Sequence, residues 1–348
     1  MTAAMETAVR DLLVELCETP SVSGDEAACA QRLLAFFEEH GREAWTDEVG
    51  NVHAPADDGA LLTSHLDTVP GEIPVRVEPT EAGEPALWGR GSVDAKGSLA
   101  AMAVAAVETG ASFLGVVGEE TDSRGARHAV KTREAPEAVI NGEPSGWDAV
   151  ALGYRGILTA TYETETDSAH AAGPSSNAIE AALAWYDRIE AALASSDGET
   201  FDRVTCKPLA VDGGPTDDGM AVAATMEVEV RIPPGNSVAD IRERVRAETT
   251  TGNVSFSDGI EPVMASPRTP VARAFRVAIR EAGGEPCLLR KTGTSDMNVF
   301  AAAWECPMVT YGPGDSALDH APNEHLLLSE LDRARDVLTT ATEQLLNP

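Results

Sequence analysis

Residues of the types that bind divalent cations follow several short apolar runs of the chain. His65 ends the run ALLTSH, Glu120 follows SFLGVVG, and Glu143 comes shortly after EAVIN. Asp94 lies among glycines in GRGSVDAKGS, and His320 comes after the run PMVTY. The carboxyl ends of the strands in an open α/β sheet meet at one edge, so we expect these side chains to converge on one cleft.

The donor set predicts the kind of metal site. Two imidazoles and three carboxylates, with no thiolate, suit zinc or cobalt better than magnesium. A bridging carboxylate would let them hold two ions about 3.5 to 4 Å apart. Each glutamate alone is also consistent with a solvated loop acid, because the chain carries 57 acidic residues. The agreement of several strand ends favours the metal site.

Two pairs of nearby residues extend this candidate site. His65 and Asp67 are two positions apart at a strand end, where side chains point to the same face. Asp67 can then accept a hydrogen bond from the second ring nitrogen of a metal-bound imidazole, although an isolated pair of this kind is more often structural. Glu119 and Glu120 leave a strand in different directions, so one can hold a metal while the other faces a bound water.

Helix-like and strand-like segments alternate in the first half of the chain. Helical spacing covers residues 5–18, and KGSLAAMAVAAVETG predicts a helix of small residues. Ser23 followed by Glu26 predicts a capping box that begins a helix ending near His40. Strands are expected at ALLTS, SFLGVVG, EAVIN and AVALG. This βαβ order predicts an α/β fold with a mostly parallel sheet flanked by helices.

The pattern changes near Gly153. From there to about Ala265 the order is strand, helix, two strands, helix and strand, which is typical of a ferredoxin-like α+β unit. The α/β pattern then resumes, and 348 residues are too many for one ordinary core. We therefore predict a catalytic domain of residues 1–153 and 266–348, with an inserted domain of residues 154–265.

The charge of the chain is strongly negative. Its 57 acidic and 26 basic residues give a net charge of -31, which opposes binding to nucleic acid and to anionic membranes. Salt near 1 M reduces the range of the internal repulsion to about 3 Å. We therefore expect a halophilic host, and the alternative is an ordinary acidic cytosolic protein.

Cysteine usage and hydropathy bear on where the protein works. The five cysteines are scattered and show no CxxC spacing, which predicts reduced thiols in a cytoplasm. Nothing resembles a secretion signal, and the longest apolar stretch, near SLAAMAVAAV, is too short to span a bilayer. We expect a cytoplasmic protein.

The motifs SHLDTVP, GRGSVDAKGSLAA, GEE, GEP and HAPNE together resemble the dinuclear-zinc amidohydrolases of the M20 peptidase class. The order of the motifs covers the whole chain. The resemblance implies a hydrolase of linear amide bonds, and it implies that the inserted unit is a lid through which two subunits dimerise. It also implies that Asp94 bridges two ions, with His65 and Glu143 on one ion and Glu120 and His320 on the other.

The resemblance implies further roles at the site. Glu119 would be the general base and Asp67 the partner of a ligand histidine. The peptide bond between Asp94 and Ala95 would be cis. DSAHAAGP resembles the lid segment whose histidine, here His170, donates to the oxyanion.

Within this class, the strings GYRG, RIPPG and KTGTSDMN look most like hydrolases that release lysine or ornithine from an acidic amino-group carrier protein. The amino acid would keep a free carboxylate during the reaction, and a guanidinium group is well suited to bind it. Arg231 is the candidate for this binding. The alternative is that Arg231 forms a salt bridge in the lid or at the dimer interface. Thr294 and Ser295, with Asp296, are candidates for the pocket or for a helix cap, and Asn177 for substrate binding or a cap.

Other functions stay open at this point. Within the class, the alternatives are acetylornithine deacetylation and dipeptide cleavage by a metallocarboxypeptidase. From a different class, the alternative is a catalytically inactive binding relative, which would have little reason to keep Glu119 together with all the ligands.

Overall fold

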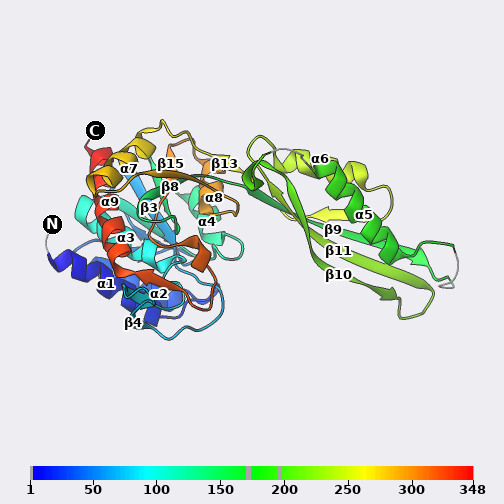
Figure 1. Ribbon diagram of the computed structural model, residues 1–348, viewed down its shortest axis with the longest axis horizontal. Coiled ribbons are helices and arrows are strands. Elements are labelled where there is room, and N and C mark those ends of the chain that lie inside the picture. Colours follow the sequence, from blue (N-terminus) through cyan, green and yellow to red (C-terminus); the bar gives the residue numbers. More distant parts are fainter. Residues whose placement is uncertain (1–2, 170–173, 195–197, 348) are drawn as a thin grey trace. The chain divides into compact units, whose positions relative to one another are not determined.

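The computed structural model describes residues 3–169, 174–194 and 198–347. The chain divides into two compact units, coloured along the sequence in Figure 1. The first contains Met1–Leu152, Ala265–Leu289 and Ser295–Pro348, and the second contains Gly153–Met264 and Arg290–Thr294. The second unit is therefore inserted into the first.

The segment Arg290–Thr294 differs from the expected division, which placed it in the catalytic part. The carbonyl of Thr292 accepts a 2.9 Å hydrogen bond from Arg155 Nε. Arg290 pairs with Glu199 and Asp202, and its guanidinium lies over the ring of Phe201. These long-range contacts hold the segment to the second unit.

One large sheet organises the first unit, in the order β1-β2-β6-β3-β7-β15-β8-β13, with β14 paired to β8. The central strands β6, β3, β7 and β15 are parallel, as predicted, and the pairings β1-β2, β2-β6, β15-β8 and β13-β8 are antiparallel. The strands are β1 (Trp45–Thr46), β2 (Val52–Ala54), β3 (Asp57–His65), β6 (Ala111–Val116), β7 (Val139–Gly142), β8 (Ala149–Tyr154), β13 (Val263–Met264), β14 (Cys287–Lys291) and β15 (Met308–Thr310).

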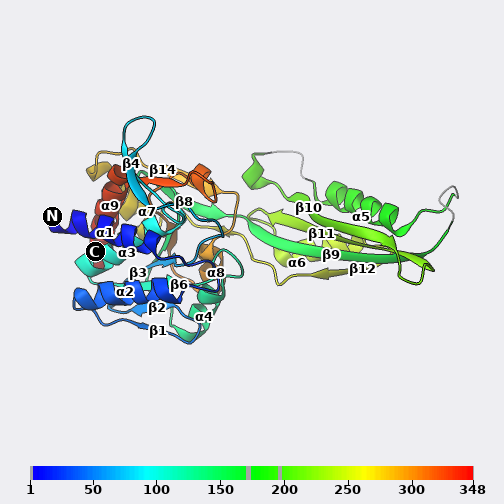
Figure 2. The same ribbon diagram turned by 90° about the horizontal axis from the view of Figure 1, so that it is seen from below.

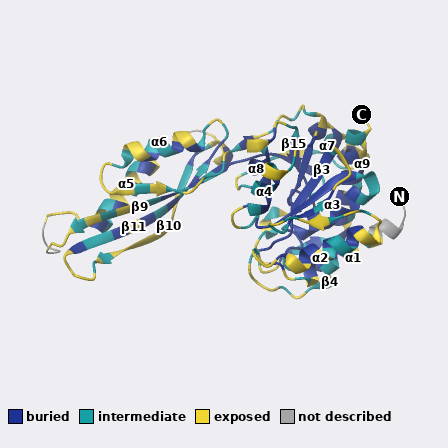
Figure 3. Cartoon of the chain, turned by 180° about the vertical axis from the view of Figure 1, so that it is seen from behind, coloured by how far each residue is buried: buried dark blue, intermediate teal, exposed yellow. Residues whose placement is uncertain are grey.

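Helices of the first unit gather around this sheet, as Figure 2 shows from a second side. They are α1 (Ala3–Glu18), α2 (Ala27–Glu39), α3 (Lys96–Thr109), α4 (Arg124–Thr132), α7 (Pro270–Glu281), α8 (Asp296–Ala303) and α9 (Leu328–Leu346), with a short 3-10 turn η2 (Ser316–Leu318). Helix α3 packs against β3, β6, α1 and α9. Residues 96–106 of α3 are all buried, which explains why the helix is built mostly from small side chains (Figure 3).

The capping box predicted at Ser23 is wrong. Helix α2 has Glu26 as its N-cap residue, without a side-chain cap. The hydroxyl of Ser23 donates instead to Asp67 Oδ2 at 2.7 Å. Glu26 accepts from the main chain of Gly24 and from Arg124. Long-range hydrogen bonds therefore replace the local pattern.

The sequence patterns also missed a small sheet in the order β16-β5-β4. Its strands are β4 (Arg76–Pro79), β5 (Pro85–Trp88) and β16 (His325–Leu327). Among the residues that the structure describes, no helix is long and apolar enough to cross a membrane.

The second unit has the predicted ferredoxin-like order. It comprises β9 (Gly156–Asp167), α5 (Ala178–Leu193), the 3-10 turn η1 (Thr200–Asp202), β10 (Thr205–Pro215), β11 (Ala221–Ile232), α6 (Val238–Glu248) and β12 (Asn253–Phe256). The sheet order is β10-β11-β9-β12, all antiparallel. Burial alternates along β9 and β11, and Trp185 of α5 stacks on Tyr162 at 4.6 Å in the core.

Candidate metal centre

The parallel strands deliver acidic and imidazole side chains to one edge of the sheet. His65 is the last residue of β3, and Glu143 directly follows β7. Glu119 and Glu120 lie in the turn after β6, and Asp94 lies two residues before α3. His320 follows η2, far along the chain.

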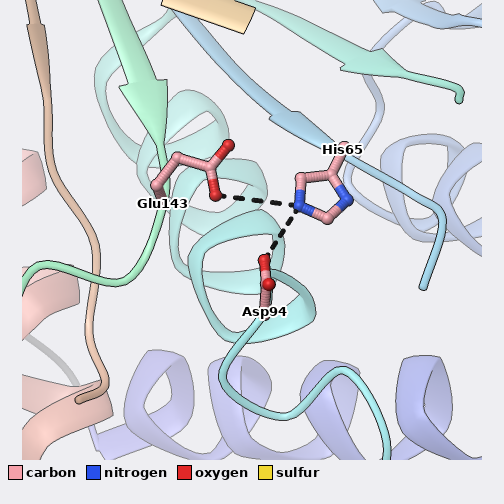
Figure 4. A group of neighbouring side chains, drawn as sticks. All are labelled: His65, Asp94 and Glu143. Atoms are coloured by element: carbon pink, nitrogen blue, oxygen red, sulfur yellow. Dashed lines mark hydrogen bonds and ion pairs between the residues drawn. The ribbon is translucent and has the colours of Figure 1, made fainter. Parts of the chain in front are cut away.

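Three of these residues form the first group of candidate ligands, His65, Asp94 and Glu143 (Figure 4). His65 Nε2 lies 3.2 Å from Asp94 Oδ1 and 3.8 Å from Glu143 Oε2. The side chain of His65 is buried, and those of Asp94 and Glu143 are nearly so. One imidazole nitrogen thus faces two carboxylates, which is the arrangement expected around a cation.

The second group is Asp94, Glu120 and His320. His320 Nε2 lies 3.3 Å from Asp94 Oδ2 and 3.0 Å from Glu120 Oε2. His320 has a left-handed backbone, with φ of 60°, and its side chain is half-exposed. This group therefore lies on the more open side of the site.

Asp94 belongs to both groups, and each of its oxygens faces a different histidine. The peptide bond from Asp94 to Ala95 is cis, as the sequence resemblance implied. Glu120 Oε1 is buried and has no hydrogen-bond partner among the described residues. An orphaned carboxylate oxygen beside a shared carboxylate and two imidazoles fits a pair of divalent cations, because buried charge needs a counter-charge.

Asp67 contacts the ring of His65 and also the turn after β6. Its main-chain carbonyl, at 2.9 Å, is the closer acceptor for His65 Nδ1, and the carboxylate Oδ1 lies at 3.6 Å. Oδ1 accepts from the Glu119 N–H, and Oδ2 accepts from the Glu120 N–H and the Ser23 hydroxyl. Asp67 therefore fixes the turn that carries Glu119 and Glu120 as well as the ring of His65.

The electrostatics of Asp67 follow from these bonds. Burial alone would raise the pKa of its carboxyl, but the neighbouring His65 and the hydrogen bonds from Ser23 and the Glu120 amide outweigh burial. Together they lower the pKa to about 2. Asp67 is therefore an anion throughout the physiological range.

The candidate ligands carry strongly shifted pKa values. Burial and then the charge of Asp94 raise the pKa of Glu120 to about 7. Hydrogen bonding to Asp94 raises the pKa of His320 to about 9. Burial opposes the charge on His65, but Asp67, Asp94 and Glu143 raise its pKa well above the usual value. The bound protons neutralise part of the negative charge that the clustered carboxylates place in this site. A bound cation would neutralise the same charge.

Glu119 is partly buried beside the two groups without belonging to either. Burial, and then the charge of Glu143, raises the pKa of its carboxyl well above the usual value. A carboxylate in such an environment is a strong proton acceptor once it is ionised, which suits acid-base chemistry.

Asp296 was expected, with Thr294 and Ser295, in the pocket or in a helix cap. It is a buried carboxylate at the first position of α8, and burial raises its pKa to about 7 against a hydrogen bond from Ser123. Asp296 Oδ1 has no partner among the described residues. The negative charge of Asp296 also contributes to the raised pKa of Glu119.

Other predicted site residues have local contacts. Ser295 caps α8 by accepting from the N–H of Met297, and Asn177 caps α5 by accepting from that of Glu180. Arg231 of β11 pairs with Glu229 of the same strand. Thr294 is half-buried in the second unit. His170 lies outside the described residues.

Comparison with known proteins gives the class. The sequence profile of peptidase family M20/M25/M40 matches residues 61–344. The chain belongs to this family and is a hydrolase.

Similar proteins carry more specific names. A LysW-lysine hydrolase from Deinococcus radiodurans is 41% identical over 97% of both chains. A LysW-lysine/LysW-ornithine hydrolase from Sulfurisphaera tokodaii is 30% identical over 97% of this chain and 95% of its own length.

Solved structures share the fold. The M20 metallo-carboxypeptidase Sso-CP2 from Sulfolobus solfataricus gives a TM-score of 0.77 at 18% identity over 99% of both chains. The YXEP protein from Bacillus subtilis, described as a dinuclear metal binding peptidase, gives 0.69 at 14% identity over 99% of both chains.

Proposed function

We propose that this chain is a dinuclear-metal amide hydrolase that releases lysine or ornithine from a LysW-type amino-group carrier protein. The proposal of a two-metal site is carried by one observation: the two carboxylate oxygens of Asp94 face different histidines. Support for the substrate comes from the similar proteins named for LysW-lysine and LysW-ornithine hydrolysis.

The five ligands of the proposed site would hold two zinc or cobalt ions. His65 and Glu143 would hold one ion and Glu120 and His320 the other, and Asp94, which belongs to both groups, would be a ligand of each. When bound, such ions would supply Lewis-acid activation of the amide carbonyl and of a water.

Glu119 is the proposed general base, since it is an acid beside both groups that belongs to neither. Its carboxylate takes a proton from the attacking water and passes it to the leaving amine nitrogen. Asp67 holds Glu119 in place through the main-chain N–H. His170 is the proposed donor to the oxyanion.

Substrate recognition is proposed for the inserted unit and its neighbourhood. Arg231 is proposed to bind the carboxylate of the amino acid. Its Nη1 atom is buried and has no hydrogen-bond partner among the described residues, which supports this role. Thr294, Ser295 and Asn177 are each proposed to contribute to substrate binding, the last two alongside their capping roles.

Subunit pairing through the inserted unit is also proposed. Strand β10 is an edge strand with a largely exposed face, including Leu209 and Val211. Leu183 is half-exposed on α5, a helix that contacts β10. An open edge with apolar side chains suits pairing with a second copy.

We also propose that the enzyme is cytoplasmic, because its free thiols are consistent with a reducing compartment.

A substrate comparison tests the proposal. Purified protein loaded with zinc or cobalt is given carrier-linked lysine, carrier-linked ornithine, acetylornithine and a dipeptide. We expect kcat/KM to be highest for a carrier adduct. Fast cleavage of acetylornithine or the dipeptide, with little turnover of either adduct, would reject the proposed substrate and favour the corresponding alternative activity.

A further inference from the structure

Glu324 is a buried carboxylate outside both groups of candidate ligands, with 1% of its surface exposed. It accepts four hydrogen bonds from one short loop. Oε2 accepts from Arg90 Nη1 at 2.7 Å and from the Gly91 N–H at 3.1 Å. Oε1 accepts from the N–H groups of Val93 at 2.9 Å and Asp94 at 3.1 Å.

Further contacts join the same two segments. Arg90 Nη1 donates to the carbonyl of Ala321 at 3.3 Å, one residue after His320. The N–H of Gly89 donates to the main-chain carbonyl of Glu324 at 3.4 Å. The loop that ends in Asp94 and the segment that begins with His320 are therefore bonded to each other.

A carboxylate is well suited to join the Asp94 loop to the His320 segment. A carboxylate offers only acceptors, and every group facing it is a donor. Hydrogen bonds to a buried charge are strong, and they leave the Asp94 backbone little freedom. The substitution Glu324→Gln would keep the size of the side chain almost unchanged, but the new amide would place its own N–H groups against N–H groups of the loop.

We propose that Glu324 is a positioning residue that aligns Asp94 and His320 for binding of the ion held by the second group. This inference rests on the proposed dinuclear site. Glu324 would act through the ligands and would not touch the metal or the substrate.

Cobalt titration against a competing chelator tests the proposal. We expect two binding phases in the wild type, and His320→Gln identifies the phase that belongs to the second group. Glu324→Gln should weaken that phase by about 10- to 100-fold, the usual effect of losing an outer partner of a ligand. Excess cobalt should restore its activity, because Glu119 and all the ligands remain.

Glu108→Gln is the matched control. Glu108 is another largely buried carboxylate, which bonds Thr339 at 2.8 Å and Arg335 at 3.3 Å within the helical layer. Both variants should lower the melting temperature, but only Glu324→Gln should weaken the His320-dependent phase. Equal weakening by both variants would reduce Glu324 to a structural role and overturn the proposal.

Two further results separate the possible failures. If Glu324→Gln does not fold, Arg90→Gln keeps the three N–H bonds to Glu324 and should weaken the same phase by a smaller factor. If the variant that folds binds cobalt in the His320-dependent phase as tightly as the wild type, the positioning role of Glu324 is refuted, but the dinuclear site is not. A wild-type protein that binds fewer than two ions refutes the dinuclear site and this role with it.

Discussion

The main-chain N–H of Glu119 donates a 3.1 Å hydrogen bond to Asp67 Oδ1. Asp67 comes two residues after His65, so the end of β3 also fixes the acids that follow β6. The candidate ligand His65 and the proposed base Glu119 are thereby held by a single anion, Asp67.

This relationship predicts the effect of Asp67→Asn. An amide cannot accept from both N–H groups and from Ser23 as the carboxylate does, so Glu119 and Glu120 should lose their alignment. We expect kcat/KM to fall about 10- to 100-fold. Ser23→Ala removes one donor and should cost less. Steady-state kinetics check both variants, and an Asp67→Asn enzyme as active as the wild type would contradict the prediction.

Glu119→Gln should abolish most activity without removing the metal. A general base contributes about 10²- to 10⁴-fold, so we expect a loss of that size in kcat. Metal content, measured by elemental analysis, should match the wild type. Asp122→Asn, an exposed acid in the same loop, is the control and should retain activity. Unchanged hydrolysis by Glu119→Gln would remove this residue from the mechanism.

Metal affinity should rise with pH. In the metal-free protein the pKa of His320 is about 9 and that of Glu120 about 7, so both are largely protonated below those values. Ligands bind in their deprotonated forms, and binding must displace these protons. Between pH 7 and 9 we expect about a tenfold gain per pH unit from His320, with a steeper dependence below pH 7.

Calorimetry in buffers of different ionisation enthalpy measures the protons released on binding. We expect more protons to be released at pH 7 than above pH 9. An affinity independent of pH over this range would contradict the shifted pKa values.

Salt should stabilise the protein. The net charge of -31 produces repulsion within the folded chain, and salt near 1 M reduces its range to about 3 Å. We expect the melting temperature to rise steadily between low salt and molar KCl. A melting temperature that does not change with KCl would remove the case for a halophilic host.

Charge on the edge of β10 should disrupt the proposed dimer. Leu209→Asp together with Val211→Asp places like charges on strands that would pair with each other. Light scattering should then report a monomer, whereas Val77→Asp, at an exposed residue of the small sheet, should leave the dimer intact. A wild-type monomer would contradict the proposed pairing.

Much of the fold follows from local patterns. His65 ends one short apolar run and Glu143 follows another, and the inserted unit has clear helix and strand periodicity. Convergence of the candidate ligands could be predicted because parallel strands share one edge.

The supporting contacts could not be predicted in the same way. Ser23 resembled a helix cap because Glu26 follows at the right spacing, but the hydroxyl bonds Asp67 across the fold. Glu324 likewise reaches the loop of Asp94 from a distant segment. Such hydrogen bonds depend on tertiary packing, which spacing along the chain does not encode.

The place of β15 has a consequence for how the protein is made. This strand lies between β7 and β8 in the sheet, although it is separated from both in the chain by the whole inserted unit. During synthesis, the edges of β7 and β8 that pair with β15 therefore stay without this partner until residues 308–310 have been translated. Protection from aggregation during translation falls to chaperones or to a late, concerted closure of the sheet.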